Sequence, residues 1–278
     1  MPHDRPYSMM TASLVRPVRV LHVSPHGSSS RADVAATEEP LEVRIEGDPF
    51  AVIMRTPGAD IELAAGFLLA ERVILGASDI QGIDRDPQSR NRIDVRIRKA
   101  HARDPTEREG ARRRVMMNSS CGLCGRVTIE SLRIEAPEIL ADWTIPAAVI
   151  AALPEALRHK QAVFNETGGL HAAGLFDRSG TLEVMAEDIG RHNAVDKVIG
   201  RMLLDDRLPL DQSVLFVSGR TSYEIVQKAY LAGIPVVGAV SAPSSLAVEL
   251  AGEAGITLLG FVRGFAFNLY SHPRRVTG

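Results

Sequence analysis

"SVLFVSGRTSYEIVQKAYLAGIPVVGAVSAPSSLAVELAGEAG", residues 213–255, contains two consecutive units in which a short apolar run is followed by an amphipathic segment. Apolar runs of about four to eight residues that end at Ser, Gly or Pro are typical of buried strands. Strands that alternate with helices predict a sheet that is covered by helices on both faces. The fold class expected from this stretch is therefore a layered α/β domain.

The segments on either side extend the same pattern. Residues 188–204 predict an amphipathic helix, because its apolar residues follow the spacing i, i+3, i+4, i+7 and i+8. These residues are Val195, Val198, Ile199, Met202 and Leu203. Residues 169–176 and 181–188 predict two strands joined by a turn, and residues 144–161 predict a helix capped by Thr144 and kinked or restarted at Pro154. Residues 256–264 and 267–272 are expected to be strands.

The first hundred residues predict a smaller unit with its own hairpin, helix and strand. Residues 40–56 alternate in hydropathy around a Gly-Asp-Pro turn and predict a hairpin. Residues 60–74 predict a helix that is capped by Asp60 and ends before Gly76, and residues 92–100 predict a strand. The buried stripe expected for this helix consists of Leu63, Phe67, Ala70 and Ile74.

We expect three parts in the chain. Residues 1–33 lack periodicity and predict a flexible N-terminal tail. Residues 34–114 predict an N-terminal α+β domain that ends in a charge-dense connection. Residues 115–278 predict the layered α/β domain, which opens with a loop that holds both cysteines.

The composition restricts the class of protein. The 278 residues carry a formal net charge of −2 and are 45% hydrophobic, enough for one large or two modest domains with a real core. A pI of about 6.5 argues against nucleic acid as a partner, because nucleic-acid-binding domains are normally basic. The most apolar stretch, from Leu231 to Val262, is interrupted by Pro235, Pro243 and Glu249, so we expect no membrane partner. The absence of a signal segment favours a soluble protein of the reducing cytoplasm.

Two predicted strands end in loops that suit phosphate oxygens. The loops "SGRTS", Ser218–Ser222, and "SAPSS", Ser241–Ser245, offer hydroxyls and free amides at helix N-termini, which carry a positive dipole. In open α/β sheets, ligands bind beyond the carboxyl ends of the strands. Ser and Thr at these positions are also ordinary helix caps, but Arg220 in the first loop favours a phosphate-bearing ligand.

A third polar cluster, "AEDIGRHN", lies where a predicted strand ends and the long helix begins. Its acidic groups could accept hydrogen bonds from a purine or a ribose, and its basic groups could bind phosphate. The cluster and the following turn comprise Glu187, Asp188, Arg191, His192, Asn193, Asp196 and Lys197.

The only two cysteines, Cys121 and Cys124, lie three residues apart in "SSCGLCG". Such a pair is typical of half a zinc site, a thioredoxin-like redox pair, or a sulfur-relay nucleophile with a helper. Zinc needs further ligands, and the best candidate, His171, follows the cysteines. In zinc deaminases the order is reversed, and a glutamate two residues after the histidine moves protons. We therefore predict no metal site.

The sequence around the cysteines favours a mobile nucleophile. Arg112, Arg113, Arg114 and Arg126 would stabilise a thiolate, and a helix beginning after Cys124 would add a positive dipole. Flanking glycines give the backbone freedom, which suits the transfer of a group between two distant partners.

Several long motifs, in order, resemble the formate dehydrogenase accessory family (FdhD/NarQ). The resemblance runs from about Leu41 to the C-terminus and is carried by "NSSCGLCG", "ETGGLHAAGLF", "AEDIGRHNAVDKVIG", "VSGRTSYEIVQKAYLAGIPVVGAVSAPSSLAVELA" and "GFVRG" before "NLYSHP". It implies a cytidine-deaminase-like fold without zinc. It also implies a sulfurtransferase that carries sulfur as a persulfide from a cysteine desulfurase to the molybdenum bis(molybdopterin guanine dinucleotide) cofactor, Mo-bisMGD, before insertion into formate dehydrogenase.

The resemblance also assigns residues. Cys121 matches the persulfide-bearing cysteine. We expect Cys124 either to take the sulfur in relay or to expel it as sulfide by closing a disulfide. The segment matching the cofactor-binding region consists of Gly260, Phe261, Val262, Arg263, Gly264, Phe265 and Ala266. Together with the polar clusters, the expected contacts to Mo-bisMGD or a guanine nucleotide add Asp188, Arg191, His192, Asn193, Ser218, Gly219, Arg220 and Ser241.

Two other functions stay open at this point. Residues 218–247 also resemble phosphosugar-binding domains of the sugar-isomerase type, and the cysteine pair alone would fit a dithiol-disulfide oxidoreductase. The sequence leaves open a homodimer, the identity of the client formate dehydrogenase, and the division of labour between the two cysteines.

Overall fold

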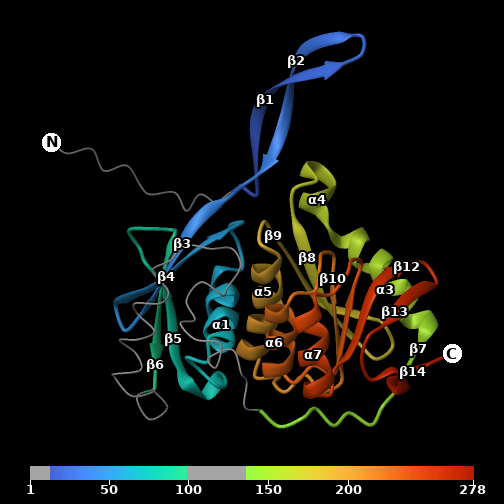
Figure 1. Cartoon of the computed structure of the whole chain (residues 1–278). Coiled ribbons are helices and arrows are strands. Elements are labelled where there is room, and N and C mark those ends of the chain that lie inside the picture. Colours follow the sequence, from blue (N-terminus) through green and yellow to red (C-terminus); the bar gives the residue numbers. More distant parts are fainter. Residues whose placement is uncertain (1–12, 99–135) are drawn as a thin grey trace.

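The computed structural model describes residues 13–98 and 136–278, and Figure 1 gives the arrangement of the elements. Cys121 and Cys124 lie outside the described residues. The described part forms a mixed α/β structure with a six-stranded sheet, a four-stranded sheet and two small two-stranded sheets. The predicted α/β class is confirmed.

The six-stranded sheet has the order β13-β12-β11-β10-β8-β9. The central strands β10, β11 and β12 are parallel, whereas β8, β9 and β13 run antiparallel to their neighbours. The strands are β8 (His171–Asp177), β9 (Leu182–Asp188), β10 (Ser213–Val217), β11 (Val236–Ala239), β12 (Thr257–Arg263) and β13 (Ala266–Leu269). The strands predicted from residues 169–176 and 181–188 are present, as are the two strands predicted from the apolar runs within residues 213–255.

Helices cover both faces of this sheet, as Figure 1 shows. Side chains of β10 alternate between two cores, with Leu215 and Val217 in one and Val214 and Phe216 in the other. Helix α3 fills the second core, while α5, α6 and α7 pack on the first. The helices are α3 (Ala147–Lys160), α4 (Ala162–Thr167), α5 (Arg191–Leu204), α6 (Tyr223–Leu231) and α7 (Ser245–Ala254).

The four-stranded sheet, in the order β4-β3-β6-β5, is joined to the larger sheet through helix α1. Its strands are β3 (Glu39–Ile45), β4 (Asp48–Arg55), β5 (Ile80–Arg85) and β6 (Arg92–Ile97), and α1 is Asp60–Ala70. One hydrophobic core runs from Leu41 and Val43 of β3 through α1 to Leu215 of β10. The two predicted domains thus share a core, and the boundary predicted at residue 114 lies outside the described residues.

Helices α1 and α5 cross at backbone contact. A Cβ atom added to Gly200 would lie 1.8 Å from the carbonyl oxygen of Glu62, and one added to Gly66 would lie 2.0 Å from that of Asp196. Heavy atoms cannot approach so closely, so both positions require glycine. The two glycines therefore set the distance between the helices.

The predicted helix boundaries need correction. Helix α1 ends at Ala70 rather than before Gly76, because Arg72 adopts a left-handed φ of 57° and the Val73 amide turns back to donate to the Leu68 carbonyl. Asp60 does not cap the helix, since its carboxylate binds Arg55. Helix α3 continues unbroken through Pro154, and Pro146 rather than Thr144 is its N-cap residue.

The flexible tail predicted for residues 1–33 is wrong for residues 15–33, which belong to a hairpin. Its strands are β1 (Val15–Ser24) and β2 (Gly27–Ala36), paired antiparallel along ten residues each. Valines at positions 15, 18, 20 and 23 provide β-branched side chains, but Pro17 and the serines of residues 28–30 obscured the alternation. The remaining short elements are η1 (Ala77–Asp79), β7 (Ile145–Pro146), η4 (Pro273–Arg275) and β14 (Val276–Thr277).

The crossing predicts the effect of adding one methyl group. Gly200→Ala should destabilise the protein by about 1–3 kcal/mol or more, because backbone must move to admit the Cβ atom. Gly252→Ala in α7 is the matched control, since its Cβ would meet nothing within 4 Å. The control should be neutral or stabilising by about 0.5–1 kcal/mol. Denaturant unfolding measures both, and a Gly200→Ala variant as stable as the control would contradict a close crossing.

Candidate functional site

Loops from three strands meet at one edge of the six-stranded sheet. The loops after β10 and β11 are tied together, since the Thr221 amide donates to the Ala242 carbonyl at 3.2 Å and the Ser244 amide donates to the Thr221 carbonyl at 2.9 Å. Within β12, the Phe261 amide donates to the Ser241 carbonyl at 3.2 Å. We call the polar groups gathered here the strand-end site. It consists of His171, Arg191, His192, Ser218, Gly219, Arg220, Ser222, Glu224 and Ser241.

His171 begins β8 and lies over the loop that follows β10. A Cβ atom at Gly219 would lie 3.2 Å from His171 Nδ1 and 3.9 Å from the Cβ of Arg191, so a side chain here would crowd the ring. The Ala172 amide donates to Ser218 Oγ at 2.9 Å, which fixes the start of β8 against this loop. Burial lowers the pKa of His171, and the neighbouring charges of Arg191 and His192 lower it further. The imidazole is therefore neutral at physiological pH.

His192 lies at the start of α5 and contacts the start of α6. Its Nε2 lies 3.0 Å from Ser222 Oγ and 3.6 Å from Glu224 Oε2, and both His192 and Glu224 are buried. Burial opposes ionisation of Glu224, but hydrogen bonds from His192 and Ser222 outweigh it and lower its pKa to about 2. Because Ser222 faces His192, α6 begins without a side-chain cap. The ionised carboxylate of Glu224, in the first turn of α6, already places a negative charge at this helix N-terminus.

Two buried polar atoms at this edge have no hydrogen-bond partner among the described residues. They are Oγ1 of Thr221, a fully buried residue, and Nε of Arg191. Buried polar atoms are nearly always paired, because an unpaired one costs about 1–3 kcal/mol. Among residues 13–98 and 136–278, these two atoms at the edge of the sheet are therefore left for another partner, and Arg191 and Arg220 give the edge positive charge.

The segment Gly260–Ala266 forms the end of β12 and the tight turn into β13. Phe261 and Gly264 adopt positive φ angles of 54° and 55°, which is unusual for phenylalanine. Phe265 at the turn is 90% exposed and Phe261 is 39% exposed. The turn thus presents two aromatic rings and Arg263 at the same edge as the strand-end site.

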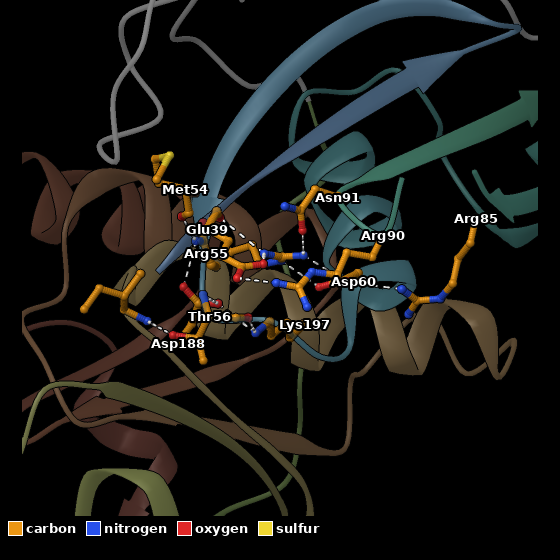
Figure 2. A network of polar contacts seen from close by, with 12 residues as sticks. Glu39, Met54, Arg55, Thr56, Asp60, Arg85, Arg90, Asn91, Asp188 and Lys197 are labelled. Carbon is orange, nitrogen blue, oxygen red and sulfur yellow. Dashed lines mark hydrogen bonds and ion pairs between the residues drawn. The ribbon is translucent and has the colours of Figure 1, made fainter. Parts of the chain in front are cut away.

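Asp188 and Asn193 make contacts with the end of β4, and their predicted contact with a ligand stays a prediction. Asp188 is fully buried, and its carboxylate lies 2.7 Å from Lys197 Nζ and accepts from the Thr56 amide at 3.1 Å (Figure 2). Asn193 Nδ2 donates to Asp188 Oδ1 and to the Met54 carbonyl, both at 2.8 Å. These groups hold the end of β4 against α5. The four-stranded sheet with α1 forms a small lobe, and the six-stranded sheet with its helices forms a large lobe. We call Thr56, Asp188, Asn193 and Lys197 the interlobe brace, because they join these two lobes.

The brace continues into a second network that the sequence did not reveal. Arg55, only 1% exposed, donates to both carboxylate oxygens of Asp60 at 2.9 and 3.3 Å and to the Glu39 carbonyl at 3.3 Å (Figure 2). Arg85 and Arg90 reach the same carboxylates, of Asp60 and Glu39 respectively, from the surface. In the sequence, this network is indicated only by an arginine at the end of an apolar strand and an aspartate at the start of a helix.

The described residues contain neither a metal site nor a membrane span. Across residues 13–98 and 136–278, no three or more His, Cys, Asp or Glu side chains are grouped to hold an ion. None of the helices in these ranges is long and apolar enough to cross a membrane.

The fold and site define a mixed α/β protein with a cationic edge where several loops converge, and the comparisons with known proteins specify the family. The model of the FdhD/NarQ family matches residues 36–277. The chain is 49% identical over 267 residues to the sulfur carrier protein FdhD of Nocardia farcinica, covering 93% of each chain. It is 46% identical over 249 residues to that of Saccharolobus solfataricus, covering 88% of this chain and 91% of the relative.

A solved structure agrees with this assignment. The crystal structure of a formate dehydrogenase accessory protein from Desulfotalea psychrophila superposes with a TM-score of 0.77 at 29% identity, covering 95% of this chain and 100% of that one. The chain belongs to the FdhD/NarQ family.

The contacts of Glu224 predict how stability depends on pH. Since folding lowers the pKa of Glu224 from 4.5 to about 2, its stabilising effect is complete above about pH 4.5 and is lost as the pH falls toward 2. Glu224→Gln should therefore cost about 1–2 kcal/mol at pH 7, allowing for solvent screening. The difference from wild type should shrink below pH 4.5 in thermal unfolding, with exposed Glu166→Gln as control. A difference that is independent of pH would contradict an ionised Glu224.

Proposed function

We propose that this protein is a sulfur carrier that serves the maturation of formate dehydrogenase. The observation that carries the proposal is the 49% identity, over 93% of the chain, to a protein named as a sulfur carrier. The chain's two cysteines supply the only thiols able to carry sulfur. The name of the Desulfotalea psychrophila protein supports formate dehydrogenase as the enzyme served.

The sulfur is carried as a persulfide on Cys121. The Cys121 thiolate attacks the terminal sulfur of a persulfide on a cysteine desulfurase, the S–S bond of the donor breaks, and the donor cysteine leaves as a thiolate. The product is a persulfide anion on Cys121, and the nearby arginines of residues 112–114 and Arg126 in the sequence favour the anionic form. The protein is thus a sulfurtransferase.

Cys124 completes the transfer in one of two ways. Its thiolate can attack the terminal sulfur, which moves the persulfide to Cys124 and leaves Cys121 as a thiolate. Alternatively it can attack the inner sulfur of Cys121, which releases hydrosulfide and closes a disulfide that a cellular thiol must then reduce. Both routes require reduced cysteines and favour the cytoplasm.

The acceptor is Mo-bisMGD, a substrate with two guanines and two pyrophosphates, and the strand-end site is its docking edge. Arg191 and Arg220 would pair with phosphate oxygens. The exposed ring of Phe265 would stack on a guanine base. The three-layered body with α3 on one face supports the cytidine-deaminase-like arrangement that the family resemblance implies.

The persulfide assignment predicts a difference between the two cysteine variants. After incubation with a cysteine desulfurase and cysteine, wild type should gain the mass of one sulfur atom, and Cys121→Ala should not. Cys124→Ala should still load sulfur but fail to pass it on. Mass spectrometry under non-reducing conditions measures the loading. Loading that is abolished by Cys124→Ala alone would reverse the order of the two cysteines, and loading of Cys121→Ala would refute the assignment.

The docking edge predicts guanine-nucleotide binding. Arg220 is exposed, so Arg220→Ala should leave the fold intact and weaken GDP binding about tenfold, through loss of one charge-assisted contact. Arg178→Ala, at the opposite end of β8, should have no effect. Titration calorimetry with GDP and with glucosamine 6-phosphate measures both. Preference for the sugar phosphate would favour a phosphosugar-binding module instead.

A further inference from the structure

Thr56, the residue that follows β4, uses all three of its polar atoms in contacts with the large lobe (Figure 2). Its amide donates to Asp188 Oδ2 at 3.1 Å, and its carbonyl accepts from Lys197 Nζ at 2.8 Å. Its hydroxyl oxygen accepts from the amide of Ile189 at 3.2 Å. Thr56 is only 2% exposed, so these contacts are shielded from water. Through this one residue the small lobe contacts the end of β9, the turn that follows it, and α5.

The backbone of Thr56 is itself fixed on both sides. Pro57 follows it, and a residue before proline is restricted to extended conformations. Arg55 precedes it and holds the Asp60 carboxylate through two hydrogen bonds, of 2.9 and 3.3 Å. Arg55, Thr56 and Pro57 are all buried. Thr56 is thus a rigid point of the small lobe from which its hydroxyl orients another segment.

The turn that Thr56 contacts leads directly into the strand-end site. Only Ile189 and Gly190 separate β9 from α5, whose first two residues are Arg191 and His192. Gly190 is the N-cap residue of α5 and has no side chain with which to cap the helix. The position of the first turn of α5 therefore depends on how the amides of Ile189 and Gly190 are held.

The first turn of α5 meets the large lobe at two places within the strand-end site. The Cβ atom of Arg191 lies 3.9 Å from the place that a Cβ atom on Gly219 would occupy. His192 Nε2 lies 3.0 Å from Ser222 Oγ. Both pairs are already at contact distance, so their geometry follows the position of the first turn. A change in the turn before α5 would therefore alter the site itself.

The hydroxyl is the one contact of Thr56 that depends on its side chain. The other two contacts use the main chain, which any residue except proline would provide in full. Valine has the same branched shape without the hydroxyl, so at this position it would leave the Ile189 amide without its acceptor. Amides shielded from water are nearly always paired, so the turn would move until this amide found another partner.

We propose that the Thr56 hydroxyl is a positioning group for the strand-end site. By holding the Ile189 amide, it sets the direction in which Arg191 and His192 face a phosphate-bearing ligand. Thr56 acts through the turn rather than by contact with the ligand. The inference rests on the proposed function for the ligand, and it makes the small lobe a working part of a site that the large lobe builds.

Three variants of the full chain isolate the hydroxyl. Thr56→Val removes it and keeps the branched shape, whereas Thr56→Ser keeps it and removes the methyl group. Thr37→Val is the matched control, because Thr37 is also only 2% exposed, but its Oγ1 has no hydrogen-bond partner among residues 13–98 and 136–278. Thermal unfolding measures the stability of each variant.

GDP is the probe, and titration calorimetry measures its affinity for each variant. Thr56→Val should weaken GDP binding about three- to tenfold, because one hydrogen bond no longer supports the arrangement that binds. Thr56→Ser and Thr37→Val should stay within about twofold of wild type, since both keep the contact with Ile189. If Thr56 were merely structural, both of its variants would weaken binding in step with their loss of stability, since serine also leaves a buried cavity. That result, or an unchanged affinity in Thr56→Val, would overturn the proposal.

A measurement without ligand separates this inference from the proposed function. The NMR chemical shifts of the His192 imidazole depend on its contacts with Ser222 and Glu224. Thr56→Val should change these shifts, and Thr56→Ser and Thr37→Val should leave them as in wild type. If wild type bound no GDP, the proposed docking edge would fail, and a shift confined to Thr56→Val would still support the positioning role. An unchanged His192 signal in Thr56→Val would overturn that role whether or not GDP binds.

Discussion

The contact between the backbones of α1 and α5 is the constraint on which the rest of the structure depends. Gly66 and Gly200 let the two helices approach until a Cβ atom on either would overlap a carbonyl of the other. This approach brings the four-stranded sheet within reach of α5, and a single hydrophobic core then extends across both sheets. Without it, α1 would have no helix to cover the face that it turns away from the small sheet.

Two faces of helix α5 make different polar contacts. Asn193 and Lys197, four residues apart, share the face that meets β4 in the interlobe brace. His192 and Asp196 share the next face and meet α6, where His192 contacts Ser222 and Asp196 pairs with Lys228 at 2.5 Å. Buried ion pairs add little net stability compared with apolar packing, but breaking one leaves a costly unpaired charge. The brace therefore fixes the register of the two lobes, and α5 delivers Arg191 and His192 to the strand-end site in one orientation.

Much of the fold could be predicted because its signal is local. The 3.6-residue periodicity of α5 and the apolar runs of β10 and β11 depend only on neighbouring residues. Glycines 66 and 200 gave no such signal, since glycine inside a helix indicates only weakness until a partner helix is known. The β1–β2 hairpin was not predicted, because its alternation of apolar and polar residues is weak. Among the described residues, no core covers this hairpin, so its sequence does not need a strict alternation.

The site was predictable as a group of loops but not residue by residue. The polar cluster before α5 has more hydrogen-bonding groups than a cap requires, which indicated a functional role. The sequence could not tell which face of α5 would meet β4 and which would meet α6. Asp188 and Asn193 turned out to hold the lobes together, whereas Arg191 and His192 remain at the edge. The contacts of Thr221 and Glu224 could not be predicted, because they join segments that lie far apart in the sequence.

Native-state hydrogen exchange tests the union of the two sheets most directly. If the glycine crossing and the interlobe brace make one cooperative unit, the slowest amides of β3, β4 and α1 should exchange through the same opening as those of α5 and β10, with free energies that agree within about 1 kcal/mol. A clearly lower opening free energy for β3, β4 and α1 alone would contradict it, because the small lobe would then unfold on its own.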